Sequence, residues 1–272
     1  MTDPGGVPFF WIDAFADRRF SGNPAAVCLL DHPAEADWMQ SVATEIGISE
    51  TAFVWPDDGA LSLRWFTPTT EVDLCGHATV AAAHALRESG RVADGSTVRF
   101  CTRSGELAAR LDGAVVELDL PADRSVVPSA APPHGWSELI DIEGPVVDAF
   151  ASELTCTVVL SDADAVVGTV PHLAAIAAQP YRVLYVTAAC AEGDADYALR
   201  VFGPAVGVDE DPVTGSAQCV LGPYWSGRLG RTVLTAVQRS KRGGRMRVTV
   251  AGDRVRVAGG AVTVLAGKVT QP

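Results

Sequence analysis

Two short polar turns in this chain, each leading into a run of small apolar residues, carry the side chains best suited to chemistry. The first turn covers residues 71–79 and the second covers residues 209–217, and each combines acidic residues with a glycine and a hydroxyl or imidazole group. Carboxylates and imidazoles transfer protons, and the free backbone amides at the start of a helix favour anions. The pattern therefore indicates acid–base chemistry on a bound organic acid.

The second turn predicts the beginning of a helix. Pro212 interrupts regular strand pairing, and Gly215 permits close approach of a ligand to the backbone. Thr214 and Ser216 are residue types that cap helix N-termini, so we expect them to cap the helix that follows. Turn and cap roles alone are the alternative interpretation of Gly215 and Ser216.

The first turn contains Asp73, Cys75, Gly76 and His77 and precedes an alanine-rich helix pattern. We expect no metal site in it, because one acid and one imidazole lack the further ligand spacing of a zinc site. The glycine motifs of dinucleotide and phosphate binding are also missing from the sequence. His84, two helical turns after His77, is interpreted as a satisfied or exposed helix histidine.

A third candidate, Glu50, stands at the start of a β-rich run, residues 48–54. In the alternation of that run it shares a side with Ala52 and Val54, so on a buried face its carboxylate must be paired, protonated or used. The alternative is an exposed edge position, because glutamate is rarely buried without a partner.

Alternating and helical hydrophobic patterns predict the elements that must position these residues. The predicted helices cover 37–46, which Gly47 ends, the alanine-rich segment up to Gly90, 171–178, and the segment after Ser216. The predicted strands cover 7–15, 25–30, 61–66, 98–100, 107–111, 115–120, 155–160, 183–187, 198–202, 233–237, 246–250, 255–257 and 262–265.

The two glycine turns, at Gly76 and Gly215, lie about half a chain apart, which suggests two similar halves that each form a sheet around one helix. We expect residues 1–118, joined again by 260–272, to form one half and residues 119–259 to form the other. The Pro- and Ala-rich residues 128–133 are the best linker candidate. If the two halves face each other, a small-molecule site lies in the cleft between them.

The composition limits the possible partners. The chain has 272 residues, 48% of them hydrophobic, and a formal net charge of -12 with a pI near 4.8. Nucleic acid and anionic membranes are excluded as partners, because both require a basic surface. No apolar run approaches a membrane span and no signal-peptide pattern begins the sequence, so we expect a cytoplasmic protein.

The six cysteines show no C-x-x-C pair, which favours free thiols over disulfides or a structural zinc site. We expect all six to be small buried side chains. They are Cys28, Cys75, Cys101, Cys156, Cys190 and Cys219.

Five motifs follow one another along nearly the whole chain: Asp13-Ala14-Phe15 with Gly22-Asn23-Pro24-Ala25-Ala26-Val27, Ser49-Glu50-Thr51-Ala52-Phe53, Arg64-Trp65-Phe66-Thr67-Pro68, Cys75-Gly76-His77-Ala78-Thr79, and Glu210-Asp211-Pro212-Val213-Thr214-Gly215-Ser216-Ala217. Together they resemble the PhzF family of phenazine biosynthesis-like isomerases. The resemblance implies an α+β fold of the diaminopimelate epimerase type. Its two pseudo-symmetric halves each roll a mostly antiparallel sheet around a central helix.

The resemblance also implies roles for individual residues. Glu50 would be the carboxylate that takes a proton from one carbon and returns it to another, with His77 and Asp211 as polar partners. The implied substrate-binding residues are Ser49, Asp73, Gly76, Thr214, Gly215 and Ser216. One departure is Gln218, which stands where the family often has histidine.

The implied function is a cofactor-independent isomerase, without a metal, that acts on a small conjugated or cyclic carboxylic or amino acid in secondary metabolism. The resemblance further implies a homodimer. Two alternatives stay open: an epimerase or racemase that uses cysteine thiols, with Cys75 at one turn, and a non-catalytic protein that binds small molecules.

Overall fold

The computed structural model describes residues 6–57, 59–123, 125, 127–128, 136–191 and 193–270. The chain divides into two compact units, Met1–Asp119 with Ala258–Pro272 (unit 1) and Leu120–Val257 (unit 2). Most of the linker candidate, residues 129–133, lies outside the described residues. Among the described residues, no helix is long and apolar enough to cross a membrane.

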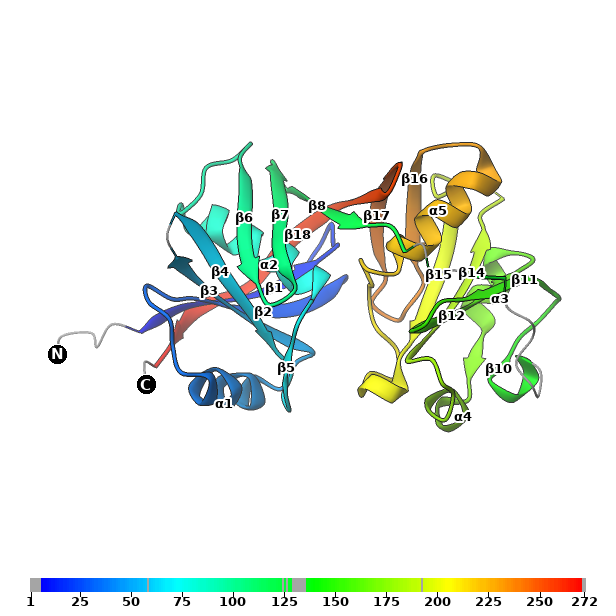
Figure 1. Cartoon of the computed structure of the whole chain (residues 1–272), viewed down its shortest axis with the longest axis horizontal. Coiled ribbons are helices and arrows are strands. Elements are labelled where there is room, and N and C mark those ends of the chain that lie inside the picture. The colour runs from blue at the N-terminus through cyan, green and yellow to red at the C-terminus, as the bar shows by residue number, and fades with distance from the viewer. Residues whose placement is uncertain are drawn as a thin grey trace. The chain divides into compact units, whose positions relative to one another are not determined.

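Unit 1 is a closed barrel of strands (Figure 1). Neighbouring strands follow the order β1-β2-β3-β4-β6-β7-β8-β18, and β18 pairs with β1 to close the ring. Closure removes the free edges of the sheet. The strands are β1 (Val7–Ala14), β2 (Asn23–Leu29), β3 (Glu50–Asp57), β4 (Ala60–Phe66), β6 (Thr97–Thr102), β7 (Gly105–Asp112), β8 (Val115–Pro121) and β18 (Arg254–Val269), with the short β5 (Glu71–Val72) beside β4.

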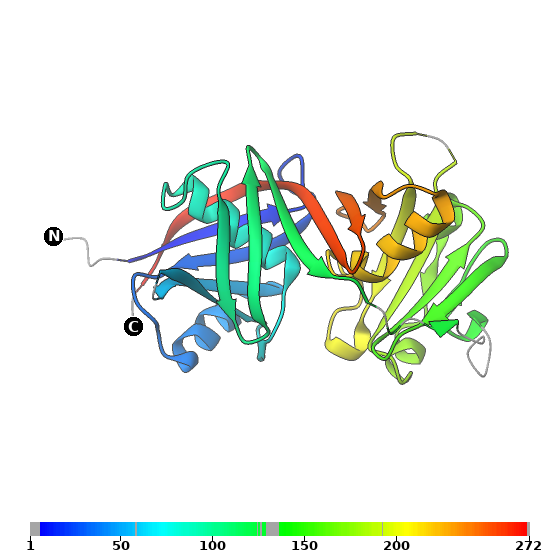
Figure 2. The same cartoon turned by 45° about the horizontal axis from the view of Figure 1, so that its top comes forward.

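Helix α2 (Gly76–Glu88) runs through the barrel, as Figures 1 and 2 show, and residues 77–86 are all buried. Small side chains explain this position, because a helix surrounded by strands on all sides has no polar face. Helix α1 (Ala36–Ile46) instead covers the outside of the barrel, with Met39 and Ala43 buried. Gly47 ends α1 in the left-handed conformation, as expected from the sequence.

Unit 2 contains an open sheet with the strand order β17-β16-β15-β14-β12-β11-β9, and β18 begins beside β17. Its strands are β9 (Val127–Pro128), β11 (Val146–Ala151), β12 (Thr155–Leu160), β14 (Val183–Ala189), β15 (Tyr197–Phe202), β16 (Val233–Gln238) and β17 (Gly244–Ala251), and β10 (Ile140–Asp141) pairs separately with β13 (Val170–Pro171). Its helical segments are η1 (Trp136–Glu138), α3 (Ala163–Gly168), α4 (Leu173–Ala177), η2 (Pro204–Val206) and α5 (Gln218–Leu229).

The two units share one pairing pattern. From β1 to β7, successive neighbours pair antiparallel, parallel, antiparallel, parallel and antiparallel. From β11 to β17 the same order occurs. In both units the long helix, α2 or α5, lies in sequence between the strands of the second parallel pair. The prediction of two pseudo-symmetric α+β halves is therefore confirmed.

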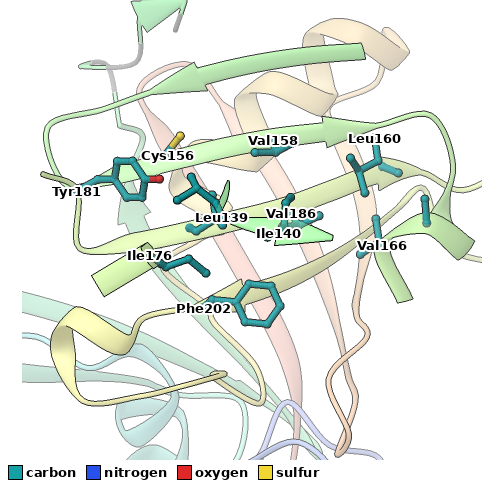
Figure 3. Packing of buried hydrophobic residues seen from close by; sticks show 13 residues of the cluster. Leu139, Ile140, Cys156, Val158, Leu160, Val166, Ile176, Tyr181, Val186 and Phe202 are labelled. Atoms are coloured by element: carbon teal, nitrogen blue, oxygen red, sulfur yellow. The ribbon is translucent and has the colours of Figure 1, made fainter. Parts of the chain in front are cut away.

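The core of unit 2 between its sheet and the short helices α3 and α4 is dominated by branched aliphatic residues (Figure 3). Val158, Val186 and Phe202 come from three neighbouring strands and are fully buried. Val166 of α3 and Ile176 of α4 close the cluster from the helical side. These short helices cover the apolar face of the sheet, which would otherwise be exposed to water.

Strand β18 corrects one prediction. The sequence predicted two strands, 255–257 and 262–265, but the structure has a single strand that continues through the glycines between them. Gly260 does not turn the chain. A Cβ on Gly260 would lie 2.4 Å from the Ala16 carbonyl oxygen, so glycine allows two strands to pass closely.

Two further expectations fail in detail. The helix predicted from Pro171 begins at Leu173, because Pro171 itself pairs with Ile140, and α3 was missed although Asp162 caps it through the Ala165 N–H at 2.9 Å. The cysteines are free, as expected, but Cys101 is exposed and Cys190 and Cys219 are half-buried. Cys101 points outward because it lies on the solvent side of the alternating strand β6.

His172, just before α4, provides a test of local electrostatics. Its Nε2 lies 3.0 Å from Asp141 Oδ2 and its Nδ1 lies 3.1 Å from the Glu138 carbonyl oxygen. Both partners are acceptors, so the charged imidazole, which donates from both ring nitrogens, satisfies both contacts. The bond to Asp141 and then the Glu138 carbonyl raise the pKa of His172 above its ordinary value. We expect Asp141→Asn to lower the pKa of His172 in an NMR titration.

The sign of the accompanying stability effect follows from this raised pKa. The contact stabilises the fold fully below the pKa of His172 in the unfolded chain and is lost as the pH rises through the folded pKa. The stability difference between the wild type and Asp141→Asn should therefore shrink on raising the pH through that range. An unchanged His172 pKa in the variant would contradict the assignment.

Candidate active site

Glu50 begins β3, a central strand between β2 and β4, and not an exposed edge. In the parallel pairing of β2 and β3 it lies opposite Ala25. Its side chain is only 16% exposed, and its Oε2 lies 3.1 Å from His77 Nε2. Among the described residues Oε2 makes no hydrogen bond, so its contact with the imidazole is that of an ion pair. The edge interpretation of Glu50 is therefore wrong.

His77 lies in the first turn of α2, where Gly76 and His77 open the helix, and its side chain is buried. One ring nitrogen, Nε2, faces Glu50 and also lies 3.5 Å from Ser49 Oγ. The other, Nδ1, lies 3.2 Å from the side-chain amide of Asn23. The imidazole is thus held on both sides by polar groups from β2 and β3.

Cys75 joins this cluster directly. Its Sγ lies 3.6 Å from His77 Nδ1, and the residue is 7% exposed. Glu50, Cys75 and His77 place one ligand atom each within 4.8 Å of one another. From the sequence, only Asp73 and His77 were considered together as possible metal ligands. In the structure the carboxylate near His77 comes from Glu50 and the thiol from Cys75. Asp73 is exposed and is not part of the cluster.

Mutual charge sets the protonation of the cluster. Burial raises the pKa of Glu50, but the facing His77 and the hydroxyl of Ser49 lower it more, so the net shift is downward. Burial lowers the pKa of His77, yet Cys75 and Glu50 raise it well above its ordinary value. Burial and the Glu50 charge raise the pKa of Cys75. The three groups therefore shift one another's pKa values through their close contact.

Gly76 has no structural reason to be glycine. A Cβ there would meet only Leu118 Cδ1, at 4.0 Å. Its conformation is helical, which any residue adopts. Close approach of a ligand to the backbone is the remaining physical use of a glycine at a helix start.

The acidic turn of unit 2 is organised differently from the expectation. Helix α5 begins at Gln218 after Ala217, and no side chain caps it. The hydroxyl of Thr214 instead donates to the Asp211 carboxylate. The capping prediction for Thr214 and Ser216 is wrong, because bonds within the turn take the place of the cap.

Gln238 of β16 holds this turn from beside it. Its Oε1 accepts from the Thr214 N–H at 2.8 Å, and its Nε2 donates to the Asp211 carbonyl at 2.7 Å. Ser240 Oγ donates to the Pro212 carbonyl at 2.7 Å. The segment around Asp211 is therefore fixed in shape by side chains that follow it in sequence.

Each unit also carries an arginine that clamps the glutamate five residues before its turn glycine. Arg64 binds both carboxylate oxygens of Glu71, at 2.6 and 2.7 Å, and Arg200 binds Glu210 in the same way, at 2.7 and 3.0 Å. Each guanidinium lies over the ring of the phenylalanine two residues later, at 5.1 and 4.9 Å. Such bidentate pairs fix orientation, so both turns are positioned by the same device.

Gln218, which stands where histidine was expected, is fully buried at the start of α5. It accepts a hydrogen bond from the hydroxyl of Tyr197, which is also fully buried, and donates to the Thr214 carbonyl at 3.3 Å. We expect Gln218→Leu to lower the free energy of unfolding by about 1–3 kcal/mol, because the Tyr197 hydroxyl loses its partner. The double variant with Tyr197→Phe should lose less than the sum of the two single variants in urea unfolding. Additive losses would contradict this pairing.

The sequence missed the place of two residues at the site. The sequence analysis named Asn23 only as part of a motif, and gave Cys75 a chemical role only in an alternative reaction. Both contact His77, at 3.2 and 3.6 Å. Asn23 lies two residues before Ala25, which pairs with Glu50 across β2 and β3. This register is a property of the sheet and cannot be read from the sequence alone.

Comparison with known proteins gives a consistent result. A model of the PhzC-PhzF family of phenazine biosynthesis-like proteins matches residues 12–267. An uncharacterised isomerase of Pseudomonas aeruginosa is 45% identical over 250 residues, 92% of this chain and 93% of the relative. An uncharacterised isomerase of Halalkalibacterium halodurans is 41% identical over 250 residues, with the same coverage of both chains.

The solved structures agree with the sequence matches. A PhzF family protein of Enterococcus faecalis has a TM-score of 0.91 at 35% identity and covers 98% of this chain and 100% of that chain. The α+β fold of the diaminopimelate epimerase type, expected from the motifs, is thereby confirmed.

Proposed function

Because this chain belongs to the phenazine biosynthesis-like family and is an isomerase of that type, we propose that it moves a proton between two carbons of a small organic acid. The substrate class is a conjugated or cyclic carboxylic or amino acid, and the reaction uses general acid–base catalysis without a cofactor. The observation that carries the proposal is the half-buried Glu50 carboxylate, held 3.1 Å from the buried His77 imidazole with a lone pair available.

In this proposal Glu50 takes the proton from carbon. The facing His77 lowers the pKa of Glu50 against the effect of burial, which favours the carboxylate form that a base requires, and the raised pKa of His77 favours a positive charge beside it. When Glu50 becomes protonated, the positive charge of His77 faces the negative charge that develops on the substrate. Glu50 then returns the proton to the second carbon, so no group is consumed.

The proposed substrate-binding residues belong to the family motifs. In unit 1 they are Gly76, at the start of α2, and Ser49, whose hydroxyl lies 3.5 Å from His77 Nε2. From unit 2 the proposal includes Asp211, Thr214, Gly215 and Ser216, on the strength of their match to the family motif. A homodimer and a role in secondary metabolism complete the proposal.

The test is a screen of conjugated amino acids, cyclic amino acids and dihydro-aromatic acids in deuterated water. An isomerase yields a product of the same elemental composition in which a double bond has moved. Deuterium from the solvent enters at the new C–H position unless Glu50 returns the abstracted proton directly. Mass spectrometry and NMR of the product distinguish these cases. Absence of any rearranged product across a screen that includes substrates of family members would count against the proposal.

An epimerase that uses the Cys75 thiol is the second candidate, because this thiol sits beside His77 in the same cluster. It predicts inversion of one stereocentre with deuterium at that carbon and no change in bonding. It also requires Cys75→Ser to abolish the reaction. Under the isomerase proposal, Cys75→Ser keeps the Glu50–His77 pair and retains turnover.

A further inference from the structure

The cluster of Glu50, Cys75 and His77 combines three different kinds of metal ligand. A carboxylate oxygen, a thiol sulfur and an imidazole nitrogen lie within 4.8 Å of one another, and among the described residues this is the one group of three or more that does so. Zinc takes these ligand types, whereas magnesium and calcium prefer oxygen alone. The donor set therefore selects a borderline-soft ion.

The spacing of Cys75 and His77 suits a tetrahedral ion, whereas Glu50 now faces the other ring nitrogen, Nε2, at 3.1 Å. Ligands bound to zinc at about 2.3 Å for sulfur and about 2.0–2.1 Å for nitrogen lie about 3.5 Å from each other. The distance from Cys75 Sγ to His77 Nδ1 is 3.6 Å. An ion at this position would displace the Asn23 amide, now 3.2 Å from the same nitrogen. The flexible Glu50 side chain can then swing toward the ion to complete three protein ligands.

We propose that Cys75, His77 and Glu50 form a zinc-binding site, and that an ion bound there switches the protein off. Three bonds to the metal form, the thiol proton and any imidazolium proton pass to solvent, and water fills the fourth position. No oxidation or reduction takes place. The ion occupies the lone pair of Glu50 that the proposed reaction needs, so binding and turnover exclude each other.

Two other histidine–carboxylate pairs and one exposed thiol in the chain serve as controls for this site. His84 Nε2 lies 3.2 Å from Glu88 Oε2, and His172 Nε2 lies 3.0 Å from Asp141 Oδ2. Neither pair belongs to a ligand group of three among the described residues. The exposed Cys101 is a thiol accessible to any soft metal. A genuine site at Cys75 must behave differently from all three.

Cobalt(II) is the probe, because it replaces zinc and its bonds to thiolate produce a charge-transfer absorption. Titration of the full chain should give this absorption in the wild type and in Cys101→Ser, and zinc should remove it. Cys75→Ser and Cys75→Ala should both lack it. His77→Asn and Glu50→Gln should weaken zinc binding by at least about 10- to 100-fold, the loss that changes around metal ligands already produce, while Glu88→Gln should bind as the wild type does.

Circular dichroism of each variant confirms that it is folded before its titration is interpreted. A missing thiolate absorption in the wild type, its survival in Cys75→Ser, or its loss in Cys101→Ser would overturn the site. Inhibition rests on the proposed function and is measured separately, as the fall in turnover on zinc addition and its recovery with a chelator. Zinc bound through Cys75 without loss of turnover would overturn the inhibitory role alone.

Discussion

Replacing Glu50 by glutamine should lower turnover by about 10²- to 10⁴-fold, the contribution of a positioned general base. Glutamine keeps the size of the side chain but cannot accept a proton from carbon. The variant should fold normally, because Glu50 is only partly buried and its amide can still contact His77. Turnover is measured on the substrate from the deuterium screen, and thermal unfolding is recorded beside it.

Glu88→Gln is the matched control for this prediction. Glu88 also holds a carboxylate oxygen near a histidine, 3.2 Å from His84 Nε2 on the same helix α2, but it lies outside the proposed site. Its loss should leave turnover within a few-fold of the wild type. Retained turnover in Glu50→Gln, or an equal loss in Glu88→Gln, would mean that the base is another group.

Gly22→Ala should cost about 2–5 kcal/mol of the free energy of unfolding. Gly22 has a φ of +67°, a left-handed conformation that costs an L-residue about 1–2 kcal/mol. A Cβ would also lie 2.2 Å from the Ala14 carbonyl oxygen and 2.8 Å from Ala16 Cβ, and overpacking adds about 1–3 kcal/mol. Chemical denaturation measures the loss.

Gly113→Ala separates the two causes in the same unit. Gly113 has a φ of +57°, but a Cβ there would meet nothing within 4 Å. It should therefore lose only the conformational part, about 1–2 kcal/mol. Equal losses in the two variants would show that close packing at Gly22 is unimportant. Because Gly22 precedes Asn23, a shift of this turn should also disturb the amide contact to His77.

The elements were predictable where hydrophobic periodicity was long and regular. Helix α1 with its stop at Gly47, the alanine-rich α2 and the strands β12, β14, β15, β16 and β17 follow patterns that depend on neighbours in sequence. Prediction failed where a distant segment decided the outcome. The glycine pair in β18 read as a break between strands, yet Gly260 serves the close passage of Ala16.

Caps failed for a related reason. Thr214 has the right type for a helix cap, and only the folded turn shows that its hydroxyl is taken by Asp211. Pro171 read as a helix start, and only its pairing with Ile140 places it in a strand. For Pro171 a contact outside the local segment decides between two local uses, whereas for Thr214 the competing partner, Asp211, lies within the same turn.

By itself the sequence determined the α+β class and the repeat of two halves, and it selected Glu50 and His77 as candidate acid–base residues, because residue types, periodicity and motif order can be read without coordinates. The tertiary structure decided the contacts. The parallel pairing of β2 and β3 sets Ala25 opposite Glu50, and the N-terminus of α2 brings His77 to 3.1 Å from the Glu50 carboxylate. Cys75 directly precedes α2, so the same helix start places its Sγ 3.6 Å from His77 Nδ1. Sequence states which groups exist, but only the packing of distant segments states which of them meet.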